Sequence, residues 1–366
     1  MADRIRFEAE VPRAPLELWP ALVVRKAELD LEIERLASRA RPADGRRRSL
    51  IVHPKATSPG LGLAPGIRVA LEVLLPGEET APIRHNSTQI GFCIHGAGSV
   101  SIADRTFAFA QHDVWNHPCW RTYVYRNPTR ALHARLTYSN AALLEQLNVH
   151  VVDEHPPAEA AEVGAPAESA TRDPRRSSPF GTLPLGSDGA QLMPYETLIN
   201  PPAVPSRPLH WPWAEVEKHL LELESLGRDY VGRRLYLLHN PITGRTNGTT
   251  PSFFATMTIR PAGIVDRPHR HSSAAINYYF QGRGRSTVEG EIVEWSAGDL
   301  MLSAPGWAVH NHASYDERVY ELTVQDQPFG IATESLLWQE DLKHPPAVLG
   351  AQTGFATNRK GGPGTA

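Results

Sequence analysis

Short apolar runs separated by polar turns dominate two long stretches of the chain, residues 49–150 and 230–330. In both stretches apolar and polar residues alternate, which is the pattern of half-buried β-strands. The 28 Gly and 32 Pro residues are dispersed among these runs, as is typical of many short strands joined by turns. We therefore predict an all-β protein built from sandwich-like or barrel-like units.

Two other stretches show the helical period. In residues 15–40, leucines and an isoleucine recur at near-helical spacing with charged side chains between them. Residues 212–226 have an apolar stripe made of Val216, Leu220, Leu221 and Leu223. We predict one helix in an N-terminal arm and a second helix between the two β-rich units.

The remaining segments carry little apolar periodicity. The linker that follows the first β-rich unit is rich in Ala, Pro and Glu, which favours an irregular crossover, and the C-terminal tail is predicted to be disordered. The predicted organisation is an arm over 1–48, a first unit over 49–150, a linker over 151–211, a helix plus second unit over 212–345, and a tail over 346–366.

Composition narrows the class of protein. A chain of 366 residues with 41% hydrophobic residues has room for two domains. The net charge is −3, with acidic and basic residues well mixed, so nothing indicates binding to nucleic acid or a membrane surface. Cys93 and Cys119 fit no zinc or disulfide pattern, and we expect both to be reduced and buried in strands. With no visible signal peptide or transmembrane run, we expect a cytoplasmic protein.

The pattern with the clearest chemical meaning is His269-Arg270-His271, with His310 thirty-nine residues after the second histidine. Residues i and i+2 of a strand point to the same face, so this pair directs two imidazoles into one space. A third histidine from an opposing strand would complete one face of a metal ion. Three imidazoles on one face leave the other face open, which favours a catalytic metal over a structural one.

Glycines and a proline stand at fixed distances from these histidines. Gly263 precedes the His-x-His pair by five intervening residues and Gly282 follows it, while Gly298 and Pro305 precede His310. These two motifs resemble those of the cupin superfamily. The resemblance implies two small antiparallel barrels, known as double-stranded β-helices, with a metal inside and with N-terminal and interdomain helices outside.

Cupins usually carry a Glu seven residues before the closing glycine of the first motif, and Ala275 stands there in this chain. A three-His site without a carboxylate, the histidine spacing and the chain length resemble gentisate 1,2-dioxygenase and its salicylate and 1-hydroxy-2-naphthoate relatives. The resemblance implies Fe(II) bound by His269, His271 and His310. Ligand type alone leaves manganese, nickel and copper open.

The two β-rich stretches form an internal repeat. Aligning Gly96 with Gly282 places His85 at the position of His271. The same comparison places Ile83 at the position of His269 and, from the proline, Tyr123 at the position of His310. The first barrel has therefore lost two of three ligands, and we predict one metal site per chain.

Four further residues are candidates for the catalytic pocket. His312 follows the third ligand by two residues and so shares its strand face; a substrate contact, a fourth ligand and a supporting hydrogen bond are all open. Asn277 and Tyr279 should share the face of the His-x-His pair, and Asn277 stands where gentisate-type enzymes carry an Arg that pairs with a carboxylate. Trp307 is expected either to wall the pocket or to pack at the barrel mouth.

The function implied is ring cleavage of a small aromatic 2-hydroxy acid by O2 in a homotetramer or homodimer. Three neutral imidazoles leave the full charge of a divalent ion, which suits a dianionic chelating substrate. Two alternatives stay open: another three-His cupin oxygenase, such as a β-diketone-cleaving enzyme, and a non-catalytic metal-binding bicupin. Storage cupins usually lose both metal sites, whereas one set of histidines is intact here.

Overall fold

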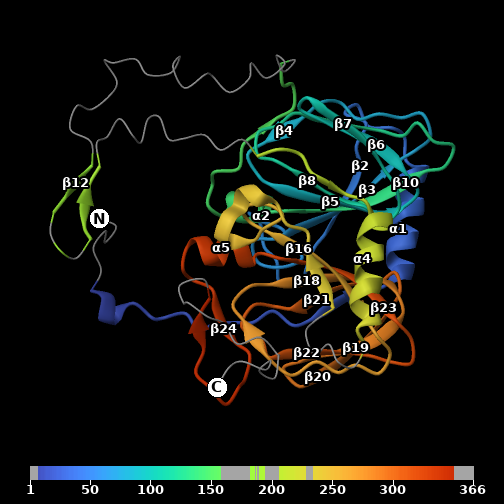
Figure 1. The fold of residues 1–366 in the computed structure, drawn as a ribbon. Helices are drawn as coiled ribbons and strands as arrows, with labels where there is room; N and C mark the ends of the chain where they lie inside the picture. The colour runs from blue at the N-terminus through green and yellow to red at the C-terminus, as the bar shows by residue number, and fades with distance from the viewer. Residues whose placement is uncertain are drawn as a thin grey trace.

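The computed structural model describes residues 7–157, 182–185, 187, 189–193, 206–227 and 234–349. Its strands form two units of the same plan, one stacked on the other (Figure 1). In each unit a six-stranded antiparallel sheet lies against a smaller three-stranded sheet. The prediction of an all-β protein with an internal repeat is confirmed.

The first unit has the strand order β14-β8-β5-β10-β3-β2 in its large sheet and β7-β6-β9 in its small sheet, with β4 and β11 paired beside them. The bounds are β2 (Arg47–Ile51), β3 (Arg68–Leu74), β4 (Arg84–His85), β5 (Gln89–His95), β6 (Gly98–Ile102), β7 (Arg105–Phe109), β8 (Val114–His117), β9 (Tyr123–Arg126), β10 (His133–Ser139), β11 (Val152–Asp153) and β14 (His210–Trp211).

The second unit has the order β1-β21-β18-β23-β16-β15, with the small sheets β20-β19-β22 and β17-β24-β25. The bounds are β1 (Leu22–Val24), β15 (Leu235–Leu237), β16 (Phe254–Arg260), β17 (Arg270–His271), β18 (Ala275–Gln281), β19 (Arg283–Val288), β20 (Glu291–Ser296), β21 (Leu300–Ala304), β22 (His310–Ser314), β23 (Val319–Gln325), β24 (Leu337–Gln339) and β25 (Ala347–Val348). A separate hairpin joins β12 (Leu183–Pro184) to β13 (Gln191–Leu192).

The two units exchange short edge strands. β1 precedes the first unit in sequence but pairs with β21 of the second, and β14 precedes the second unit but pairs with β8 of the first. Both exchanged strands cover an edge that would otherwise expose unpaired backbone groups. Both ends of the linker predicted over 151–211 therefore form strands of the first unit, β11 paired with β4 and β14 paired with β8, a correction to the irregular crossover expected there.

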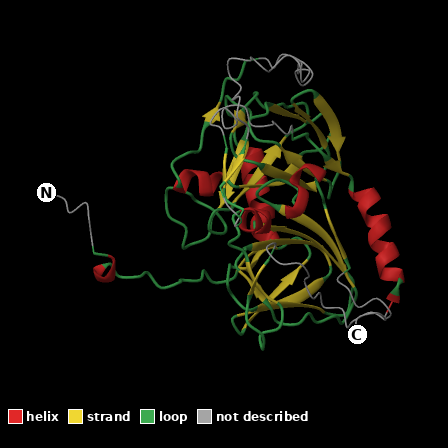
Figure 2. Ribbon diagram, turned by 60° about the vertical axis from the view of Figure 1, so that its left-hand side comes forward, coloured by secondary structure: helices red, strands yellow, loops and turns green. Residues whose placement is uncertain are grey.

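Helices lie outside the sheets (Figure 2). The predicted interdomain helix is confirmed as α4 (Trp213–Ser225). The N-terminal helix α1 (Lys26–Ser38) is shorter than the predicted 15–40. Pro20 and the β-branched pair at Val23 disfavour a helix there, so the preceding residues form strand β1 instead. The remaining helical turns are α2 (Ala141–Gln146), α5 (Gln327–Ala332), η1 (Glu8–Glu10) and η4 (Pro241–Thr246).

Alternate residues of the central strands point to opposite faces of the large sheet, and both faces are buried. Along β18, Ile276 and Tyr278 belong to a continuous apolar core between the two units, while Tyr279 faces the interior of the second barrel. In the first unit Phe92 packs edge-on against Tyr278, with ring centroids 5.5 Å apart. The two large sheets thus share one core, and each barrel keeps a separate interior.

Three further expectations have an outcome here. Strand β2 begins at Arg47, so the boundary predicted between residues 48 and 49 falls inside a strand of the first unit. Cys93 is buried, but Cys119 is exposed because it lies in the turn after β8, a correction to the prediction that both are buried in strands. The predicted disordered tail begins at residue 346, but Ala347–Val348 form strand β25 paired with β24, a correction to that prediction. Most of the predicted linker, and the tail from residue 350 onward, lie outside the described residues. Among the described residues, no helix has the length and apolar character needed to cross a membrane.

Candidate metal centre

The three motif histidines meet inside the second barrel. His269 immediately precedes β17, His271 lies in it, and His310 begins β22. The backbones of His269 and His310 bond to each other in both directions, with N···O distances of 3.1 and 2.9 Å. This bridge brings together two segments that are about forty residues apart in sequence, and all three side chains are buried.

Their ligand nitrogens lie within 4.8 Å of one another. The ring centroid of His310 is 4.4 Å from that of His269 and 4.8 Å from that of His271. In the part of the chain that the structure describes, no carboxylate or thiol joins this group. Ala275, at the place of the usual cupin Glu, is buried at the start of β18. The donor set is therefore three imidazoles.

Each of these imidazoles is held by its Nδ1 atom. In each case Nδ1 bonds to a backbone carbonyl. Because a carbonyl oxygen only accepts, Nδ1 carries the proton, and Nε2 carries the lone pair that can bind a metal. Such bonds fix both the tautomer and the ring orientation of metal-binding histidines. The carbonyl partners lie two residues away, at 3.0 Å for Arg267, 2.9 Å for Ser273 and 3.0 Å for Ala308.

His312 lies next to the histidine group without joining it. It is half-buried, and its ring centroid is 5.7 Å from that of His310. Its Nδ1 is 2.8 Å from the Ser286 hydroxyl, which accepts a bond from Trp295 Nε1 at 3.0 Å. When the Ser286 hydrogen points to Nδ1, the His312 proton sits on Nε2, which is then a hydrogen-bond donor.

Asn277 faces the barrel interior as expected, but its amide is engaged. Its Nδ2 donates to Thr323 Oγ1 at 2.9 Å, and its Oδ1 accepts from Ser303 Oγ. Because the amide is held from two neighbouring strands, its orientation is fixed. Asn277 therefore contributes an oriented neutral dipole and no charge.

Tyr279 shares the interior face with Asn277, but it is packed in the core. Its ring stacks on Trp295, with centroids 3.7 Å apart and planes 5° apart, and it is fully buried. Burial raises the pKa of its phenol well above the usual value, so the hydroxyl is neutral. This placement favours a packing role for Tyr279 over direct contact with substrate.

Trp307 lies on the outer side of the His-x-His strand. The Arg270 guanidinium sits over its ring, 4.4 Å from the centroid, and Arg270 Nε donates to Gln339 Oε1 at 2.6 Å. Arg270 points away from the two histidines that flank it, as its place in the strand requires. Trp307 therefore packs at the barrel rim beneath Arg270.

Sequence reasoning missed two residues at this site. Trp338 in β24 stacks against His271, and Ser286 in β19 bonds to His312. Trp338 could not be found from the sequence because the equivalent strand β11 of the first unit was itself predicted to be irregular linker. Nothing in the sequence distinguishes Ser286 from other strand serines.

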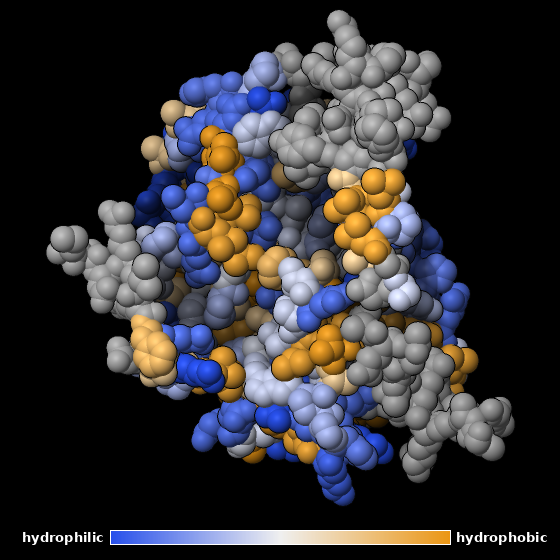
Figure 3. All heavy atoms as spheres, turned by 90° about the vertical axis from the view of Figure 1, so that its left-hand side faces the viewer, coloured by the Kyte–Doolittle hydropathy of each residue, from blue (hydrophilic) through white to orange (hydrophobic). Residues whose placement is uncertain are grey.

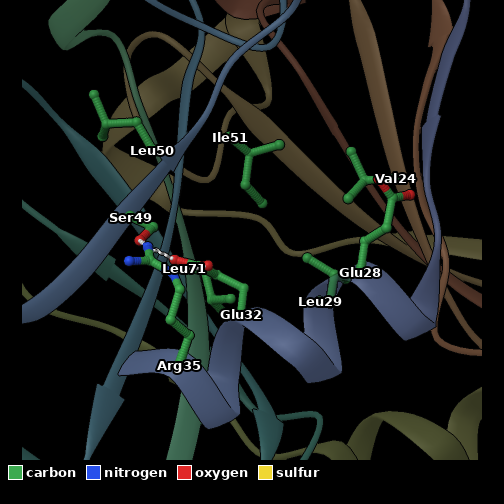
Figure 4. Close-up of a pocket in the computed structure, with 9 residues that line it drawn as sticks. All are labelled: Val24, Glu28, Leu29, Glu32, Arg35, Ser49, Leu50, Ile51 and Leu71. Atoms are coloured by element: carbon green, nitrogen blue, oxygen red, sulfur yellow. Dashed lines mark hydrogen bonds and ion pairs between the residues drawn. The ribbon is translucent and has the colours of Figure 1, made fainter. Parts of the chain in front are cut away.

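A surface cavity of about 430 Å³ lies apart from the histidines, between α1 and β2 (Figure 4). Glu32 within it bonds to Arg35 and Ser49, which also line the cavity, and Glu28 accepts a bond from the Arg25 N–H. None of its lining residues belongs to the histidine group. We assign no function to it.

Comparisons with known proteins bear on this geometry. A family model described as an AraC-like ligand binding domain matches residues 260–354, which contain all three histidines. The 5-nitrosalicylic acid 1,2-dioxygenase of Bradyrhizobium sp is 29% identical over 140 residues, 37% of this chain and 67% of the relative. The gentisate 1,2-dioxygenase of Streptomyces sp is 34% identical over 136 residues, 36% of each chain. That of Haloferax sp is 25% identical over 270 residues, 72% of this chain and 71% of the relative.

A comparison with solved structures identifies proteins of the same fold. The salicylate 1,2-dioxygenase from Pseudaminobacter salicylatoxidans superposes with a TM-score of 0.70 at 17% identity, covering 91% of both chains. Parts of the chain are similar in sequence to 5-nitrosalicylic acid and gentisate 1,2-dioxygenases, and the chain shares the fold of the salicylate 1,2-dioxygenase. The predicted two-barrel cupin architecture is thereby confirmed. The similarity to the Streptomyces gentisate 1,2-dioxygenase spans about a third of the length of that protein.

Proposed function

We propose that this protein is a non-haem Fe(II) dioxygenase that cleaves the ring of a small aromatic 2-hydroxy acid. The observation that carries the proposal is the convergence of three buried imidazoles, each held by its Nδ1, with no carboxylate in the group. Curated relatives named gentisate and 5-nitrosalicylic acid 1,2-dioxygenase support the substrate class.

The donor set fits a catalytic metal. Three protein ligands on one side of an ion leave positions open for other molecules, unlike a closed structural site. When bound, Fe(II) would supply those positions to the substrate and O2 and provide a path for electrons between them. Because the imidazoles are neutral, the charge of a divalent ion is not compensated by the protein, and a chelating dianion is favoured electrostatically.

The residues around the histidines have separable roles in this proposal. His312, oriented by Ser286, donates from Nε2 to the substrate carboxylate. Asn277 presents its fixed amide where a guanidinium stands in similar enzymes, so the chain relies more on His312 to hold the carboxylate. Holding substrate and O2 in one geometry removes much of the entropy cost of their encounter.

A direct test is anaerobic reconstitution of metal-free protein with Fe(II), followed by oxygen-uptake measurements on a panel of salicylate, gentisate and 5-nitrosalicylate. We expect stoichiometric O2 consumption with loss of the aromatic absorbance for at least one member. Oxygen uptake with a β-diketone alone would favour the other three-His oxygenase chemistry. Iron binding without any turnover would favour a non-catalytic bicupin.

We further propose that the chain forms a homo-oligomer, a tetramer or dimer. Apolar side chains gather in patches on the face shown in Figure 3. One run of exposed apolar residues follows α2 and comprises Leu147, Val149, Val151 and Val152, each at least 44% exposed. Patches of this kind mark interaction surfaces on soluble proteins. Light scattering at micromolar protein should give a multiple of 40.3 kDa, and a monomeric mass would overturn this proposal.

A further inference from the structure

The indole of Trp338 lies against two of the three histidines. Its ring centroid is 4.9 Å from that of His271, with planes 24° apart, and 5.7 Å from that of His269, with planes 29° apart. Trp338 is the cross-strand partner of His271 in the pair β17–β24. Cross-strand partners project from the same face, so both rings point to the metal side.

Strand β24 is tied firmly to the segment that carries the histidines. The Ser272 backbone N–H donates to the Leu337 carbonyl at 2.9 Å, and the Leu337 N–H donates to Ser272 Oγ at 2.9 Å. On the other side of Trp338, the Arg270 side chain donates to the side chain of Gln339 in β24. The indole is therefore held in position by the backbone and by side chains on both sides of it.

The first unit contains the same arrangement without the indole. Strand β11 pairs with β4, which places Val152 opposite His85, and Arg84 Nε donates to Asp153 Oδ2 at 2.9 Å. The Arg84 guanidinium also covers Trp120, at 4.8 Å, as Arg270 covers Trp307 in the second unit. The paired strand and the Arg–Trp contact thus occur with and without a histidine triplet. The cross-strand partner of the histidine is aromatic only in the unit with the triplet, where Trp338 takes the place of Val152; the ring nearest His85 on this side is that of His150, at 6.2 Å.

We propose that Trp338 is a positioning residue of the metal centre. The Nδ1 bonds fix one edge of each imidazole, and the flat indole restricts the rotation that remains to His269 and His271. Its apolar ring also keeps water from that flank of the ligands, which strengthens their interaction with a cation. This inference rests on the proposed metal site.

The test uses metal-free full-length protein and Co²⁺ as the probe, with affinity measured by chelator competition and the ligand geometry by visible absorption. Trp338→Val installs the side chain of the first unit. We expect it to weaken Co²⁺ binding roughly 10- to 100-fold, the range for residues that support metal ligands, and to shift the absorption bands. Trp338→Phe keeps a flat ring and should retain most of the affinity.

A second measurement does not depend on the valine variant folding. Co²⁺ should quench part of the tryptophan emission of the wild type, and Trp338→Phe should lose most of that quenching. Trp120→Phe, in the first unit, is the matched control and should keep it. Wild-type affinity and spectrum in Trp338→Val, or unchanged quenching in Trp338→Phe, would overturn the positioning role. Failure of the wild type to bind Co²⁺ would instead overturn the metal site itself.

Discussion

His85 in the first unit and His271 in the second occupy the same place in the repeat and are held in the same way. Each Nδ1 donates to a carbonyl two residues later, at 3.0 Å to Ser87 and 2.9 Å to Ser273. On the other side of the ring the two units diverge. His85 Nε2 bonds to the Tyr123 hydroxyl at 3.2 Å, whereas His271 faces two further imidazoles. The same frame therefore supports a hydrogen-bonded histidine and tyrosine in one unit and a group of three imidazoles in the other.

The interior of the first barrel is filled by large side chains. Trp115 and Tyr125 are fully buried, and their polar atoms bond at 2.9 Å. Trp115 occupies the space above Gly91, where a Cβ would lie 2.3 Å from the indole. Gly91 stands at the position of Asn277 in the repeat. At this position the interior of the first barrel is filled by the Trp115 indole, whereas the interior of the second barrel holds the Asn277 amide.

Charge is also handled differently in the two interiors. In the first, Glu72 pairs with Arg135; burial would raise the pKa of Glu72, but Arg135 and Arg48 lower it to about 2. Burial lowers the pKa of His85 to about 4, so this histidine is neutral near pH 7. In the second, Glu321 stands at the position of Arg135 and pairs with Arg260 at 3.0 Å. Each interior therefore holds a buried Arg–Glu pair, but the repeat position that carries the arginine in the first unit carries the glutamate in the second.

The largest expected effect comes from breaking the triplet. His310→Ala leaves two imidazoles, too few for a stable site, so both metal and turnover should be lost. Tyr123→Phe alters the equivalent position of the first barrel and should leave about one metal per chain. Metal analysis of both reconstituted proteins checks this, and two tightly held metals per wild-type chain would contradict the difference drawn between the barrels.

Restoring the missing carboxylate should separate metal binding from catalysis. In Ala275→Glu the added negative charge weakens the electrostatic attraction between the bound metal and a dianionic substrate. We expect metal to be retained while kcat/KM for the hydroxy acid falls roughly a hundred-fold, about 2.7 kcal/mol. Ala275→Gln has the same size without the charge and should lose less. Equal losses in steady-state kinetics of the two variants would assign the effect to space alone.

Removing the His312 ring should affect substrate capture more than metal content. A hydrogen bond to a charged group contributes about 1.5–3 kcal/mol, so His312→Ala should lower kcat/KM roughly 10- to 100-fold. Ser286→Ala removes the bond that orients the ring and should give a smaller loss. Iron content and kinetics are measured on the same preparation. Loss of iron from His312→Ala would make His312 a fourth ligand.

The smallest effect concerns stability. Burial raises the pKa of Asp326 to about 7, opposed by a bond from the Ala274 N–H at 2.8 Å. The folded state then keeps this proton up to about pH 7 while the unfolded state releases it near pH 4, so folding stability falls as pH rises between these values. In the first unit Asn140 Oδ1 accepts the equivalent bond from the Thr88 N–H, and its uncharged amide adds no such pH dependence to stability.

Asp326→Asn should therefore stabilise the metal-free protein at pH 8, by on the order of 1–4 kcal/mol, and have little effect at pH 4. Urea unfolding at both pH values measures the difference. A stabilisation of the same size at both pH values would show that the pKa of Asp326 is the same in the folded and unfolded states, and would contradict the raised pKa.

The sequence by itself determined the repeat, the fold class and the three histidines. Strand alternation fixes which side chains share a face, and the glycine and proline spacing of the two motifs fixes where the strands turn. His269 and His271 could therefore be placed together from spacing alone. His310 was assigned through the motif resemblance, because spacing says nothing about which strand lies opposite.

Other features depended on contacts between segments distant in sequence. The exchange of β1 and β14 between units, the packing of Tyr279 on Trp295, and the indole of Trp338 beside His271 are set by which strand edges meet. Local pattern encodes the face on which a side chain lies but not its neighbour across a sheet or a barrel. That neighbour decides whether a histidine in this fold bonds to a tyrosine, as His85 does, or faces two more imidazoles, as His271 does.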